Sequence, residues 1–136
     1  MTSPILALRA AILGAVQADA ALAALMGGSV RLHDEAPRAA EPVYAVFGEV
    51  TASDASTGTE RAREQRLTLV VWAREGSARS GLEAAERLAA LLDDAPLALA
   101  GHRLANLRVA EVAAARDEAS GLACVTVRLR ALTETL

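Results

Sequence analysis

The chain has 136 residues, of which 53% are hydrophobic but only 2% aromatic, so alanine, leucine and valine must form its core. A chain of this length buries roughly two-thirds of its unfolded surface, which predicts one domain over residues 1–136 that needs neither a metal nor disulfides. Its net charge of −3, with no lysine, argues against a free-standing nucleic-acid binder, because such proteins present a concentrated basic face.

The N-terminal region predicts a helix over residues 4–17, since a serine and a proline open it and apolar residues then recur at helical spacing. Asp19 is suited to cap a second short helical turn, which Gly27-Gly28 ends by supplying left-handed backbone. We do not expect the apolar run to be a signal peptide or a membrane span, because no positive charge precedes it and Arg9 lies inside it.

Two strands with a long polar connection are predicted next. A short strand over 30–33 precedes them. Residues 43–50 are mostly apolar, and residues 64–73 alternate, with Leu67, Leu69 and Val71 on one face. The intervening residues 51–63 contain no large apolar side chain and no periodicity, which predicts a long polar loop at the tip of a hairpin.

A further helix is predicted over about residues 81–93. Ser80 and Glu83 have the spacing of a capping box, and Glu83 and Arg87 have the i,i+4 spacing of an ion pair. The apolar stripe of this helix consists of Leu82, Ala85, Leu88, Ala89 and Leu92. Strands over 104–112 and 122–132, joined by residues 113–121, then predict a second hairpin.

These elements predict an α+β fold with a mostly antiparallel sheet of four to five strands and helices packed on one face. The uncovered face would carry four large polar or aromatic side chains from the alternating strands, which are Arg66, Trp72, Arg128 and Arg130. A solvated charged face is the plain interpretation. Tryptophan beside arginine is also enriched at protein interfaces, so we predict that these residues form a subunit interface.

The polar loop has two interpretations, a disordered tip or an arm that contacts a partner. Polar and charged side chains fill it. The contact arm would use Ser53, Asp54, Ser56, Thr57, Thr59, Glu60, Arg61 and Arg63. We expect this loop to be mobile in the isolated subunit and to become ordered on a partner surface, because its composition cannot form a core.

No group of residues has the spacing of an active site. His33, Asp34 and Glu35 are adjacent, but neighbouring strand residues point to opposite faces, and His102 lies far away in the sequence. Cys124 is the only cysteine and lies in an alternating strand. We therefore expect no catalytic residue, no metal site and no cofactor.

Four blocks of the sequence resemble, in the same order, the tail-completion family of long-tailed phages, prophages and gene transfer agents. The blocks are residues 22–32, 42–49, 67–72 and 94–104, the last of which contains Asp-Ala-Pro-Leu and Gly-His-Arg. Each block alone is common, but the four occur in the order of the family, and the resemblance runs over nearly the whole chain. The family is not enzymatic, so the resemblance carries over no catalytic residue.

The resemblance implies a structural tail terminator. Such a protein forms a ring, usually hexameric, that caps the head-proximal end of the tail tube and joins it to the head connector. DNA would pass through the lumen unread. The protein would then be found in the bacterial cytoplasm during assembly and later in the particle, away from membranes.

Three alternatives remain. The same fold serves head-completion rings. A small cytoplasmic ligand-binding domain would use a pocket between the helix at 81–93 and the sheet. A hydrolase would need a nucleophile or a metal beside His33 or His102.

Overall fold

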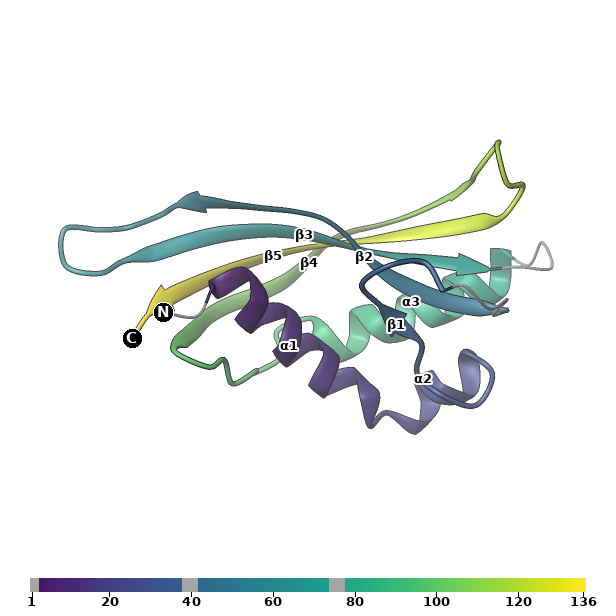
Figure 1. The fold of residues 1–136 in the computed structure, drawn as a ribbon, viewed down its shortest axis with the longest axis horizontal. Helices are drawn as coiled ribbons and strands as arrows, with labels where there is room; N and C mark the ends of the chain where they lie inside the picture. Colours follow the sequence, from purple (N-terminus) through teal and green to yellow (C-terminus); the bar gives the residue numbers. More distant parts are fainter. Residues whose placement is uncertain (1–2, 38–41, 74–77) are drawn as a thin grey trace.

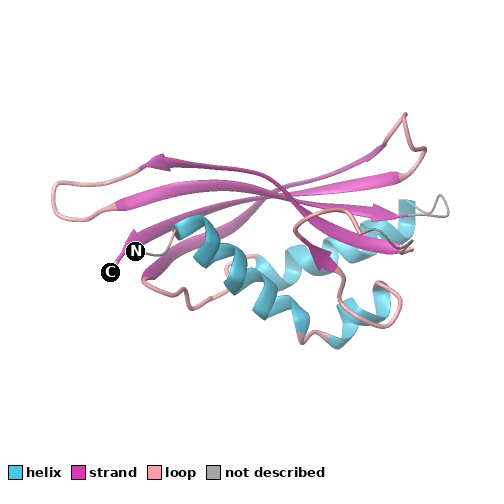
Figure 2. Cartoon of the chain, viewed as in Figure 1, coloured by secondary structure: helices cyan, strands magenta, loops and turns pink. Residues whose placement is uncertain are grey.

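The computed structural model describes residues 3–37, 42–73 and 78–136. In this part of the chain the elements are α1 (Pro4–Gln17), α2 (Ala20–Leu25), β1 (Leu32–His33), β2 (Val43–Asp54), β3 (Ala62–Ala73), α3 (Ala78–Leu92), β4 (His102–Arg116) and β5 (Ala123–Thr135). The strands form one sheet in the order β1-β2-β3-β5-β4, in which only the β1–β2 pair is parallel. The helices lie on one face of this sheet (Figures 1 and 2), so the predicted α+β class is confirmed.

The N-terminal helices begin and end at the predicted signals. The Ser3 hydroxyl accepts a hydrogen bond from the Leu6 amide at 3.4 Å, and Asp19 caps α2. Gly27 and Gly28 have φ angles of 99° and 122°, which is the left-handed backbone that glycine adopts without steric cost. Among the described residues, no helix is long and apolar enough to cross a membrane.

The core lies between the helices and the sheet. It is lined on the sheet side by the predicted alternating residues, including Leu69 and Val127, which are fully buried. A Cβ atom on Gly81 of α3 would lie 3.4 Å from the Ala73 Cβ and from the Val125 Cγ2. The absence of a side chain at Gly81 therefore lets α3 lie close to the end of β3 and the start of β5.

The two hairpins have longer strands than predicted. Residues 51–54 belong to β2 and residues 62–63 to β3, so the predicted loop over 51–63 is wrong at both of its ends. In the second hairpin, β4 reaches Arg116 and β5 reaches Thr135. In β2 and β4 most of the added residues, 51–54 and 113–116, are exposed, and the adjacent strand satisfies their backbone groups.

Helix α3 differs from its prediction in three respects. Because α3 already contains Ala78, Ser80 lies inside the helix, and the predicted capping box is wrong. Leu82, assigned to the apolar stripe, is exposed by 36%. Glu83 pairs with Arg79 at 2.8 Å, whereas Arg87 turns toward a distant partner.

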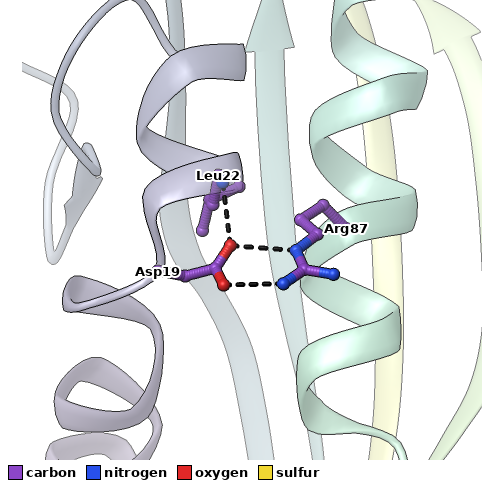
Figure 3. A network of polar contacts seen from close by, with 3 residues as sticks. All are labelled: Asp19, Leu22 and Arg87. Atoms are coloured by element: carbon purple, nitrogen blue, oxygen red, sulfur yellow. Dashed lines mark hydrogen bonds and ion pairs between the residues drawn. The ribbon is translucent and has the colours of Figure 1, made fainter.

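That distant partner is Asp19, and the contact joins α3 to the start of α2 (Figure 3). Arg87 donates from Nε to Oδ2 at 2.9 Å and from Nη2 to Oδ1 at 2.6 Å, which is a bidentate geometry. Asp19 Oδ2 also accepts the Leu22 amide at 2.8 Å. These hydrogen bonds, with that from Arg87 the largest cause, lower the pKa of Asp19 from 3.8 to about 2.

The depressed pKa makes a prediction for acid stability. The carboxylate of Asp19 stabilises the fold fully above the unfolded pKa of 3.8, and this contribution is lost as the pH falls toward about 2. We expect Asp19→Asn, which keeps a good helix cap, to be less stable than the parent at pH 7 and to lose less stability between pH 4 and pH 2. Thermal unfolding across this pH range measures the difference. Parallel pH profiles for the two proteins would contradict it.

Candidate interaction surface

The face of the sheet opposite the helices carries the four side chains predicted for it. In the strand register, Arg66 lies opposite Arg130, Thr68 opposite Arg128, and Trp72 opposite Cys124. The alternate residues of β3 and β5, such as Leu67, are buried against the helices. The sequence therefore placed Arg66, Trp72, Arg128 and Arg130 on the correct face.

Three of these residues line one hollow on the uncovered face. Its volume is about 430 Å³. The hollow is lined by Glu49, Thr51, Arg66, Leu67, Thr68, Ala110, Arg128, Leu129 and Arg130. It thus spans β2, β3, β5 and β4, and brings together arginine side chains that are more than 60 residues apart in the sequence.

The charges around the hollow are mostly balanced within the subunit. Arg66 Nε lies 2.9 Å from Glu64 Oε1, and Arg128 Nε lies 3.0 Å from Glu111 Oε1. Arg130, at the centre of the row, makes no ion pair with another described residue. It has Arg66 on one neighbouring strand and Arg108 on the other. A guanidinium between two others favours an anionic group from outside the subunit.

Trp72 does not share this hollow. It lies six residues from Arg66 along β3, which corresponds to about 20 Å at the rise of a strand. Its neighbour across β2 is Tyr44, which is buried, and the ring centroid of Tyr44 lies 6.5 Å from that of His33. The uncovered face therefore has an arginine end and an aromatic end, which strand alternation alone could not distinguish.

The tip of the β2–β3 hairpin extends beyond the helices (Figure 1) and has hydrogen bonds of its own. Ser56 Oγ donates to Asp54 Oδ1 at 2.6 Å and accepts the Ala62 amide at 3.1 Å. Thr57 and Glu60 bond through their backbones at 2.9 Å. Of the residues predicted for the contact arm, Ser53, Asp54 and Arg63 lie in the strands, and Ser56, Thr57, Thr59, Glu60 and Arg61 lie in the tip.

One acidic residue of the tip also contacts the end of β5. Both Glu134 carboxylate oxygens accept from Arg103 Nη2 at 2.7 Å, and this contact is the largest cause of the lowered pKa of Glu134. A hydrogen bond to Glu134 raises the pKa of Glu60. The Thr135 amide also donates to the Arg61 carbonyl at 3.0 Å, so the base of the tip is joined to β5, a contact that no local pattern indicates.

The candidate catalytic and metal-ligating residues lie apart. His33 is beside Tyr44, Asp34 pairs with Arg9 at 3.3 Å, and His102 is buried at the start of β4. Within the described ranges, no group of three or more His, Cys, Asp or Glu side chains is arranged to hold a metal.

A test for a structural metal follows from this arrangement. We expect a chelator to leave the unfolding temperature unchanged, because no described cluster supplies the ligands that a structural metal requires. Thermal unfolding with and without the chelator, together with metal analysis of the purified protein, provides the measurement. A stoichiometric metal in the purified protein would contradict the prediction.

The space between α3 and the sheet is filled rather than open. Ala84, Ala85 and Leu88 on the inner side of α3 have no exposed surface. Their packing against the sheet opposes the alternative of a ligand pocket in this layer.

Comparison with known proteins agrees with a role in a phage-like tail. The family model described as tail completion protein gp17 matches residues 10–134. A solved chain from the "Virion of native gene transfer agent (GTA) particle" superposes with a TM-score of 0.88 at 27% identity, covering 98% of this chain and 99% of that one. A search of curated proteins found no match. Because the family model covers most of its length, the chain belongs to the gp17 family of tail completion proteins.

Proposed function

We propose that this protein is a structural tail terminator rather than an enzyme. Several copies, most simply six, form a ring that caps the head-proximal end of the tail tube and joins it to the head connector. The observation that carries the proposal is the match to a tail completion family, together with a gene transfer agent chain of the same length and fold.

The uncovered sheet face supplies a contact surface for this assembly. It combines the hollow around Arg130 with the half-buried Trp72, and arginine and tryptophan are both enriched where proteins meet. We propose that Arg66, Trp72, Arg128 and Arg130 are buried against a neighbouring subunit. The hairpin tip, with Ser53, Asp54, Ser56, Thr57, Thr59, Glu60, Arg61 and Arg63, contacts the tail tube or the neighbour.

DNA passes through the ring without being read. The arginines on the uncovered face are largely neutralised within the subunit, because Glu64 and Glu111 pair with two of them. Tight phosphate binding requires several uncompensated cations, and the net charge of the chain is −3. A weakly charged passage would let DNA leave the particle.

Trp72→Ala is expected to weaken assembly, because it removes the largest aromatic side chain from the proposed subunit contact. Native mass, measured with and without added tail tube protein, reports the ring. Trp72→Phe is the matched control and should retain most of the assembly. Trp72 lies opposite Tyr44 in the sheet, so thermal unfolding of each variant checks that the substitution has not destabilised the fold. Rings formed by a folded Trp72→Ala variant as readily as by the parent would show that Trp72 lies outside the interface.

A further inference from the structure

The two long outer strands of the sheet are each covered over only half of their length. On β2, the short strand β1 pairs with Ala45 and Val46. On β4, the Asp94 amide donates to the Leu107 carbonyl at 2.8 Å, and the Val109 amide donates to Asp93 Oδ1 at 2.9 Å. These contacts protect the first half of each strand from pairing with another chain.

The second halves are open. For residues 48–54 of β2 and residues 110–115 of β4, no backbone hydrogen bond from the described chain reaches the outer edge. Each open segment follows a register shift, at Phe47/Val50 in β2 and at Val109/Glu111 in β4. Open edges are usually blocked by proline or by charged side chains; the β4 segment has no proline, and its Glu111 pairs with Arg128 of β5. Its small side chains are Ala110, Ala113, Ala114 and Ala115.

We propose that the open half of β4 in one copy pairs with the open half of β2 in the next copy, so that the sheets of neighbouring subunits become continuous. This inference rests on the proposed assembly of several copies and adds an edge contact to the face contact. The partner is a second copy of this chain because its two open segments are similar in length and run antiparallel to each other.

The direction follows from the sheet topology. β2 is antiparallel to β3, β3 to β5, and β5 to β4, so β4 runs antiparallel to β2. A neighbour whose sheet continues the first one therefore presents β2 in the antiparallel sense. The two hairpin tips that adjoin these segments point to opposite ends of the molecule (Figure 1), so the contact joins unlike surfaces. Repetition of such a contact generates a ring when the rotation closes.

The side chains restrict the register to pairings that keep the same faces of the two sheets together. Ala52 lies opposite the buried Gln65, and Val112 lies opposite the buried Val127, so both point to the helix side of their sheets. Pairing Ala52 with Val112 places the helices of both copies on the same face of the continuous sheet. A shift by one residue would bring polar Thr51 or Ser53 to the apolar side.

Cysteine cross-linking tests this register. In a Cys124→Ser background, Ala52→Cys and Val112→Cys are made in separate chains and mixed with tail tube protein under oxidising conditions. We expect a disulfide-linked dimer in the mixture and none in either variant alone, because only unlike positions meet. Ala105→Cys, an exposed alanine in the covered half of β4, replaces Val112→Cys as the matched control and should not cross-link with Ala52→Cys.

The outcomes separate this inference from the proposed function. Rings without the Ala52–Val112 cross-link would overturn the edge pairing and leave the tail terminator proposal standing. A dimer formed by Val112→Cys alone would also overturn it, because two β4 edges would then meet. The cross-link in an assembly that does not cap tails would support the edge pairing and refute the proposed function. A protein that stays monomeric with tail tube protein would contradict both.

Discussion

Replacing Leu69 with alanine is expected to lower the free energy of unfolding by about 2–5 kcal/mol, because it empties a fully buried site between the central strand β3 and the helices. A domain has only about 5–15 kcal/mol of stability in total. The core of this protein contains several alanines and few aromatic side chains, so we expect the cavity to remain largely unfilled. Denaturant unfolding measures the loss.

Val70→Ala is the matched control for this substitution. Val70 is the next residue of the same strand but lies on the uncovered face and is only partly buried. Its truncation should cost about 1 kcal/mol, since fewer methyl groups lose their burial. Equal losses for the two variants would mean that the layer between the helices and β3 is not the main core.

Periodicity predicted the parts of the fold that an apolar side chain must cover. The alternation around Leu69 and Val127 defined the faces of β3 and β5, and the caps at Ser3 and Asp19 defined the start of two helices. Beyond the helix layer no face has to be apolar, so the pattern disappears while the strands continue. Residues 51–54 were missed for this reason.

The remaining features depend on contacts between distant parts of the chain. Arg87 was expected to pair within its own helix, but Asp19 offers a bidentate partner 68 residues away. Gln65 is polar yet fully buried, because β3 alternation turns it to the helix side, where its Nε2 donates to the Pro4 carbonyl and to Thr133 Oγ1. Such pairs follow from the strand order, which local patterns do not determine.

The candidate surface shows the same division. Alternation placed four residues on one face, but only the pairing of β3 with β5 puts Arg66 beside Arg130 and leaves Trp72 at the other end. The hollow is therefore a property of the sheet rather than of a motif. Its charge balance also depends on Glu111 of β4, a residue that local patterns did not single out.

Shortening the β2–β3 tip is expected to leave the subunit folded and to abolish the joining of tails to heads. The segment to be removed is residues 56–61, because the Ala55 amide still donates to the Ala62 carbonyl across the hairpin at 2.9 Å. An Asn-Gly turn between these two alanines matches the twist of a two-residue hairpin. The deletion removes Glu60 and the Arg61 carbonyl that accepts from the Thr135 amide, but no part of the hydrophobic core. Its unfolding temperature should therefore stay close to that of the parent.

A variant of unchanged length distinguishes reach from side-chain chemistry. Replacing Thr57, Thr59, Glu60 and Arg61 with glycine or alanine keeps the chain length but removes the groups that could pair with a partner. If the tip acts through these groups, both variants should yield free tails and unjoined heads, counted by electron microscopy of particle preparations. If only the shortened variant fails, the length of the hairpin matters and its charges do not. Normal tails joined to heads in both variants would mean that the tip has no part in assembly, and the contact would then have to come from the uncovered face and the open strand edges.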